Sequence, residues 1–170
     1  MPEEFRNLRA LAHPLGLRIL SLLAGSAMSA AEVAREIGGT QANVSYHLRT
    51  LREAGLVEVV DEVRVRGGMA KRYRHEPSSG ERFAERDVEQ ERVCAAALGE
   101  ELRRRGEHRR NGPPSTTTDA ELWVEEQVRD AAVAKARELG VLRHGAARAP
   151  RTPGTIGVSA TVSLFAMADR

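Results

Sequence analysis

Polar side chains that suit both base edges and phosphates are concentrated between residues 40 and 49 of this 170-residue chain. Arginine pairs with guanine or phosphate, and glutamine or asparagine pairs with adenine. Serine, threonine and tyrosine hydroxyls suit phosphate oxygens. This chemistry predicts contact with double-stranded DNA. The candidate residues are Thr40, Gln41, Asn43, Ser45, Tyr46 and Arg49.

Helical periodicity separates these candidates from an apolar face. At about 100° per residue, Val44, Leu48 and Leu51 fall within a narrow arc that is expected to face a core. The candidates lie opposite that arc or on the first turn, which is the part of a recognition helix that leads into the DNA groove. His47 flanks the arc, and we interpret it as a structural histidine rather than a base reader.

The helix that carries the candidates is the second of two short helices predicted over residues 29–55. Ser29 followed by Glu32 is a capping-box pattern, which satisfies backbone amides where the first helix begins. Gly38-Gly39 ends that helix, because glycine tolerates a left-handed exit. Thr40 suits the N-cap of the second helix. Two short helices joined by a glycine turn predict a helix-turn-helix unit.

Two more helices are predicted ahead of this pair. Residues 3–12 show an amphipathic pattern with Phe5, Leu8 and Leu11 on one face. Pro14 suits the first position of a helix over 14–24, where its missing N–H costs nothing. This second helix is expected to bury Leu15, Ile19, Leu20, Leu22 and Leu23.

A basic β-hairpin is predicted directly after the helix pair. Residues 56–60 and 63–66 have strand character, Gly67-Gly68 offers a tight turn, and 70–75 returns as a strand. Between Val63 and His75 the hairpin carries no acid, which favours phosphate as its partner. The alternative is a solvated edge hairpin whose charges only oppose aggregation. The candidate phosphate contacts are Arg64, Arg66, Lys71 and Arg72.

A long charged helix is predicted over residues 81–110. Its apolar seam is thin and favours pairing with a second copy of the chain. The alternative is packing against the first helix of the same chain, and the two arrangements are compatible. The seam consists of Ala84, Val88, Ala95, Leu98 and Leu102.

The C-terminal part is predicted to be a small α+β extension over residues 119–170, after a linker at 111–118. Strands are expected at 120–124 and 156–167, with a helix over 125–139 between them. The extension is interpreted as a dimer brace or an effector module. Trp123, Phe165 and Met167 are the candidate effector-binding residues, although a core role suits them equally well.

The N-terminal motifs resemble winged helix-turn-helix regulators of the ArsR/SmtB family. The resemblance covers residues 5–76 and is most specific in the string VSYHLRTLREAGLV. It implies a homodimeric transcription factor, usually a repressor, that binds an inverted repeat. Residues after 110 resemble the tail of some actinobacterial members. The expected fold is mainly α with a β-hairpin wing, comprising a DNA-binding domain over 1–80, a dimerisation helix over 81–110 and the C-terminal extension.

The sequence departs from the metal-sensing members of that family. Those members place cysteines on the helix before the recognition helix, and this chain has Ala30, Ala31, Val33 and Ala34 there, which cannot ligate a metal. Others use histidines with carboxylates on the last dimer helix, where this chain has Asp87 and Glu91 but no histidine before His108. We therefore expect no metal and no cofactor. A redox switch through Cys94 is an open alternative.

Composition and missing motifs narrow the function further. The net charge is +2, and the single cysteine leaves no intrachain disulfide. No signal peptide or membrane span is apparent, so we expect a cytoplasmic protein. Motifs of hydrolases, P-loop proteins and metalloproteases are missing, so we expect no enzymatic activity. The alternatives are a winged helix that binds protein rather than DNA, and a regulator that responds to a small-molecule effector.

Overall fold

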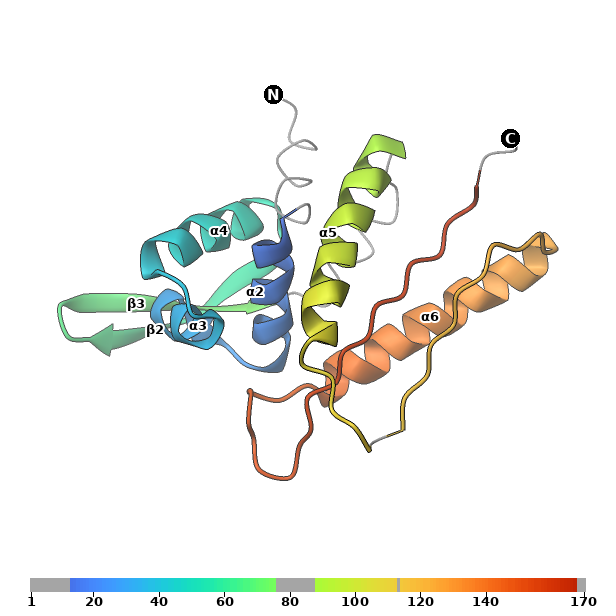
Figure 1. Ribbon diagram of the computed structural model, residues 1–170. Coiled ribbons are helices and arrows are strands. Elements are labelled where there is room, and N and C mark those ends of the chain that lie inside the picture. The colour runs from blue at the N-terminus through green and yellow to red at the C-terminus, as the bar shows by residue number, and fades with distance from the viewer. Residues whose placement is uncertain (1–12, 76–87, 113, 168–170) are drawn as a thin grey trace.

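The computed structural model describes residues 13–75, 88–112 and 114–167 (Figure 1). The predicted helix over 3–12 and the start of the predicted helix over 81–110 lie outside these ranges. The described elements, in chain order, are α2 (Pro14–Gly25), β1 (Met28–Ser29), α3 (Ala30–Ile37), α4 (Gln41–Glu53), β2 (Val57–Val65), β3 (Gly68–His75), α5 (Val88–Gly106) and α6 (Glu126–Ala146). The mainly α winged helix-turn-helix fold is therefore confirmed.

The ends of α3 and α4 follow the predicted local signals. The Ser29 hydroxyl accepts from the Glu32 backbone N–H, and the Glu32 carboxylate accepts from the Ser29 N–H at 2.7 Å, which completes the capping box. Gly38 ends α3 in the left-handed region, with a φ of 69°. The Thr40 hydroxyl accepts from the Asn43 N–H at 3.3 Å and caps α4. The helix-turn-helix geometry is thus set by local chemistry.

The wing is a β-hairpin that belongs to a three-stranded antiparallel sheet. β2 pairs with β3 from Val57 opposite His75 to Val65 opposite Gly68, with an irregularity between Val59 and Asp61. The two predicted strand runs before the turn are therefore one continuous strand. The third strand, β1, pairs with β3 through two residues and was not predicted, because two residues are too short to show an alternating pattern.

The core lies where α2, α3 and α4 meet the start of β2. Ile19 and Leu23 of α2 are fully buried, as predicted, whereas Leu15 and Leu22 are only partly buried at its edge. Burial of these apolar side chains supplies the main driving force for the fold of this domain. The remaining core comprises Leu20, Met28, Val33, Ala34, Val44, Leu48, Leu51, Ala54, Leu56 and Val57.

α5 packs against α2, but it does so with a face adjacent to the predicted seam. The buried residues of α5 are Cys94, Ala97 and Glu101, whereas Val88 is 80% and Leu102 54% exposed. Of the predicted seam, Val88, Ala95 and Leu102 are exposed, Leu98 is half-buried, and Ala84 lies outside the described residues. α5 thus packs within the chain against α2, and pairing of the seam with a second copy stays a prediction.

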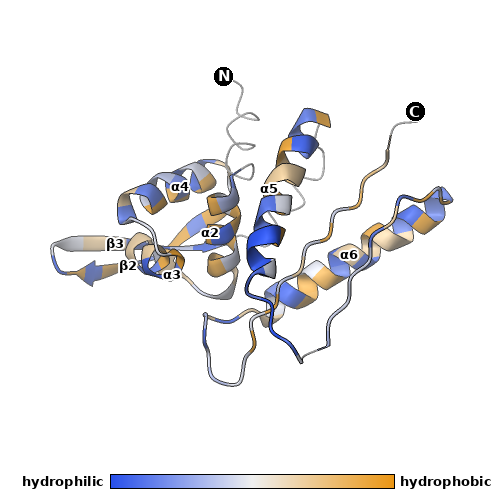
Figure 2. Cartoon of the chain, viewed as in Figure 1, coloured by the Kyte–Doolittle hydropathy of each residue, from blue (hydrophilic) through white to orange (hydrophobic). Residues whose placement is uncertain are grey.

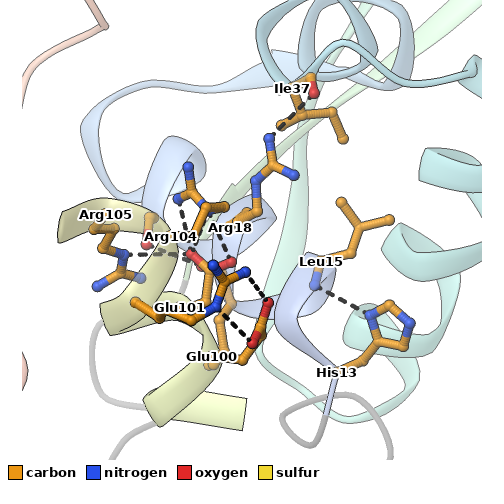
Figure 3. Close-up of polar contacts among 11 residues, drawn as sticks. His13, Leu15, Arg18, Ile37, Glu100, Glu101, Arg104 and Arg105 are labelled. Carbon is orange, nitrogen blue, oxygen red and sulfur yellow. Dashed lines mark hydrogen bonds and ion pairs between the residues drawn. The ribbon is translucent and has the colours of Figure 1, made fainter. Parts of the chain in front are cut away.

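A buried carboxylate on α5 explains why a charged residue occupies that face. Glu101 is 1% exposed and accepts from Arg104 Nη2 at 2.8 Å and from Arg105 Nε at 3.3 Å (Figure 3). These charge-assisted hydrogen bonds compensate the loss of water around the carboxylate. The same carboxylate raises the pKa of Arg104 above its ordinary value, chiefly by accepting its hydrogen bond. Nearby, Arg18 of α2 donates to the Ile37 carbonyl at 3.1 Å and ties α2 to the end of α3.

The C-terminal arm, residues 119–167, contains one helix and no strand within the described residues. α6 confirms the predicted helix and extends it to Ala146. The predicted strands at 120–124 and 156–167 are wrong, and so is the α+β extension that they defined. In the described part of the chain neither segment has a neighbouring strand, so no hydrogen-bonded ladder forms there. Across the described residues, no helix is long and apolar enough to cross a membrane.

Candidate nucleic-acid interface

The face of α4 opposite the core is exposed along its length. Val44, Leu48 and Leu51 are fully buried, which confirms the predicted core arc. Among the candidates, Tyr46 is 56% exposed, and its neighbours on the same face are also accessible. The exposed candidates on α4 and its cap are Thr40, Gln41, Asn43, Ser45, Tyr46 and Arg49.

Tyr46 and Arg49 form a pair on this face. The Arg49 guanidinium carbon lies 5.7 Å from the centre of the Tyr46 ring, within the range of a cation–π interaction. One turn further, the Thr50 hydroxyl donates to the Tyr46 carbonyl at 3.1 Å. The pair restricts the Arg49 side chain before any ligand binds, which lowers the entropy that binding must overcome.

His47 lies behind Tyr46, inside the protein. Its ring is 4.7 Å from the His13 ring and 5.5 Å from the Tyr46 ring, between ring centres. Burial, and secondarily the charge of His13, lower the pKa of His47 below its ordinary value. His13 in turn caps α2, since its Nδ1 accepts from the Leu15 N–H at 3.1 Å (Figure 3). The interpretation of His47 as a structural residue is confirmed by its burial.

An open groove of about 710 Å³ separates the wing from α3 and α4. Gln41 and Ser45 of the exposed α4 face contribute to one wall, and Arg66 and Lys71 of the wing contribute to the other. Arg35 of α3 also lines the groove. Sequence reasoning missed Arg35, because only the folded crossing of α3 and α4 places it beside the wing.

The register of the wing concentrates its unopposed positive charge near the tip. Acidic residues of β2 stand opposite basic residues of β3 toward the base, as in the pairs Glu58–Arg74 and Glu62–Lys71. Directly opposed residues share a face of the sheet, so these charges partly offset each other. Arg64 instead stands opposite Met69, and Arg66 lies in the turn, outside both strands. Both arginines are exposed.

Arg72 is placed apart from the other candidate phosphate contacts. Its guanidinium donates to the Ala27 carbonyl, and its Nε lies 3.9 Å from the Glu32 carboxylate. The Glu32 pKa is lowered, first by the hydrogen bond from the Ser29 backbone and with a smaller contribution from the charge of Arg72. Arg72 therefore connects the base of the wing to the cap of α3, a position that favours a structural role.

Potential metal ligands are sparse in the described parts of the chain. No group of three or more histidine, cysteine, aspartate or glutamate side chains lies close enough there to hold a metal ion. Cys94 is buried on α5. Asp87 lies outside the described residues.

Comparison with known families supports the helix-turn-helix assignment. Residues 11–60 match the family model of a helix-turn-helix domain. The match ends within β2, so the wing tip, α5 and the arm lie beyond it. A search of curated proteins found no match. Together, the match and the fold support a DNA-binding regulator of transcription.

Proposed function

We propose that this chain is a homodimeric transcriptional repressor of the ArsR type that binds an inverted repeat in double-stranded DNA. α4 enters the major groove, and the wing tip contacts the adjacent phosphate backbone. The observation that carries the proposal is the exposed polar face of α4, because two of its residues, Gln41 and Ser45, share a groove with the basic side chains of the wing. Base-reading and phosphate-binding groups thus lie side by side.

The homodimer is supported by the exposed seam of α5. Val88, Ala95 and Leu102 recur at intervals of seven residues and remain exposed although α5 packs on α2. Apolar residues at this spacing lie along one side of a helix and pair with the same line on a second helix. A two-fold dimer would present two copies of α4 to half-sites about one helical turn apart.

The repressor and ArsR assignments rest on the resemblance of residues 5–76 to that family. We propose a non-metal input, because Ala30, Ala31 and Ala34 offer no ligands on α3. A small-molecule effector is expected to act through the arm, where Trp123, Phe165 and Met167 are exposed. Their role in effector binding stays a prediction.

Selection of bound duplexes from a random DNA pool with the purified full chain tests the proposal. We expect a palindromic motif with half-sites spaced by about one helical turn, together with steep weakening of binding as salt rises. A single unrepeated half-site would contradict the dimer while leaving DNA binding in place. Negligible affinity for duplex DNA at any salt concentration would contradict the proposal as a whole and favour a winged helix that docks proteins.

A further inference from the structure

The arm has no hydrophobic core of its own. None of the 21 residues of α6 is buried, and no described residue from 119 to 167 is buried. Trp123 is 84% exposed. Figure 2 shows apolar residues distributed along α6 and along the extended segment that follows it. The exposed large apolar residues are Leu122, Trp123, Val124, Val128, Leu139, Val141, Leu142, Ile156, Val158, Val162, Leu164, Phe165 and Met167.

This apolar surface is larger than a monomeric protein ordinarily exposes. A half-exposed large apolar side chain offers on the order of 100 Å², so these thirteen residues exceed the roughly 800 Å² per partner that a stable interface buries. A helix in water gains most of its stability from packing of its apolar face rather than from intrinsic propensity. α6 therefore needs a surface that the described residues of its own chain do not provide.

Among the described residues, the extended segment at 156–167 has no strand partner. Ile156, Val158, Ala160, Val162 and Leu164 alternate with other residues, as in a strand with one apolar face. The segment is nevertheless not part of the described sheet, and Arg143 Nη1 of α6 donates to its Ala160 carbonyl at 3.2 Å. Unpaired, extended backbone of this kind adds readily to another exposed strand.

The base of the arm is fixed to the helix-turn-helix domain, so its position is set even though its surface is not covered. The backbone at Arg148 passes so close to Gly25 that a Cβ there would stand 2.2 Å from the Arg148 carbonyl oxygen. Arg151 donates to the Glu36 carboxylate on α3. From this base, α6 projects away from the α2–α4 domain (Figure 1). The arm is thus presented outward on the same molecule that exposes the seam of α5.

We propose that the arm packs on a second copy of this chain, so that residues 122–124, α6 and the segment 156–167 of each copy are covered by the other. The extended segments then pair between the copies. The inference rests on the homodimer proposed above and adds a second, larger interface to it. A second copy is always present at equal concentration and carries the same unpaired segments. A two-fold arrangement therefore covers the apolar surface of both arms at once. A different protein would leave the arms uncovered whenever it was absent.

Trp123 provides a direct probe because it is the only tryptophan in the chain. The test dilutes the full chain while following tryptophan emission, quenching by iodide and molecular mass by sedimentation. We expect Trp123 to be protected at the concentrations where the mass is that of a dimer. On dilution to the monomer, its emission should shift to longer wavelength and its quenching constant should rise several-fold.

Two substitutions in the arm form a matched pair for this experiment. Val158→Asp places a charge on the apolar face of the segment 156–167, and we expect it to raise the concentration at which Trp123 becomes protected by at least tenfold. Ser159→Asp adds the same charge one residue later, on the opposite face, and should leave that concentration nearly unchanged. Equal effects of the two substitutions would overturn the proposed pairing face.

The remaining outcomes separate this inference from the proposed function. A dimer by mass in which Trp123 stays fully quenchable overturns the covered arm, while the α5 dimer and DNA binding stand. Protection of Trp123 in the monomer shows that the arm folds onto its own chain, which also overturns the inference. A chain that is monomeric at every concentration yet binds DNA overturns both the covered arm and the homodimer.

Discussion

At the scale of single residues, Tyr46 and Arg49 act together in the proposed DNA contact because their side chains touch. Replacing either residue should weaken the contribution of the other to DNA binding, since the Tyr46 ring positions the Arg49 guanidinium. Helical periodicity predicted both residues on the face opposite the core, and the structure adds that they form a pair. That coupling depends on rotamers, which a sequence pattern does not specify.

We expect Arg49→Ala and Tyr46→Ala each to weaken binding to the selected operator by about 1–3 kcal/mol, with the dimer unchanged. The double variant should lose less binding free energy than the two single variants together, because the effects of substituting residues in contact are not additive. Binding isotherms at fixed salt measure these losses. Arg110→Ala, which removes an exposed arginine from the loop after α5, is the control. Operator affinity at the wild-type level in Arg49→Ala would refute the assigned face.

The buried histidine behind Tyr46 predicts a pH dependence of stability. Because burial lowers the folded-state pKa of His47, the unfolded chain binds the proton more readily, and the free energy of unfolding decreases as pH falls below about 6.5. The loss ends once pH is below the folded-state pKa. Urea unfolding between pH 7.5 and 5 should show a smaller decrease for His47→Gln than for the wild type. If the free energy of unfolding depends on pH in the same way in both proteins, His47 is not the source of the pH dependence.

At the scale of elements, the wing contributes charge mainly where no acid opposes it. Arg64 and Arg66 lie at or beside the turn, whereas Arg74 stands opposite Glu58. Phosphate contacts determine the salt dependence of binding rather than its sequence preference. The wing tip should therefore strengthen binding to all duplexes alike.

Replacing both Arg64 and Arg66 with alanine should reduce the slope of log affinity against log salt by about 2, since each lost phosphate contact contributes about 0.9. Affinity should fall by the same factor for operator and random duplex. Arg74→Ala is the control at the base of the same wing, and we expect little change in slope. The measurement is a salt titration of both duplexes, and an unaltered slope in the double variant would place the wing away from DNA.

The elements that sequence reasoning predicted correctly are those with local signals. The capping box at Ser29 sets the start of α3 and the left-handed Gly38 sets its end. Both signals act through neighbouring residues and do not depend on tertiary packing. The buried face of α5 was not predicted, because it includes Glu101, whose burial depends on Arg104 and Arg105 and which apolar periodicity does not identify. Arg35 was missed because a tertiary crossing places it in the groove.

At the scale of the whole molecule, the predicted strands of the arm show how a correct local pattern leads to a wrong structure. Ile156 to Leu164 alternate as a strand does, and the alternation is real. A strand also requires a neighbour, and the described chain does not bring one to this segment. If the second copy supplies that neighbour, the pattern reports on the assembly rather than on the single chain.

The close approach at Gly25 predicts how to loosen the arm without changing any polar group. Alanine in place of a helical glycine ordinarily stabilises a helix by up to about 1 kcal/mol, but here its Cβ meets the Arg148 carbonyl. We expect Gly25→Ala to speed tryptic cleavage after Arg148 and Arg151 several-fold, while the helix-turn-helix domain stays folded by circular dichroism. Gly99→Ala, where a Cβ has open space, is the control. Equal cleavage rates in both variants would show that this contact does not hold the arm.

The end of α3 is where three parts of the molecule meet. Ile37 receives a hydrogen bond from α2, Glu36 holds Arg151 of the arm, and the next residues form the turn into α4. Any change in the arm that alters operator affinity through this joint must obey thermodynamic reciprocity, so operator DNA changes the arm equilibrium by the same factor. If such a coupling exists, the arm reports DNA occupancy as well as controlling it.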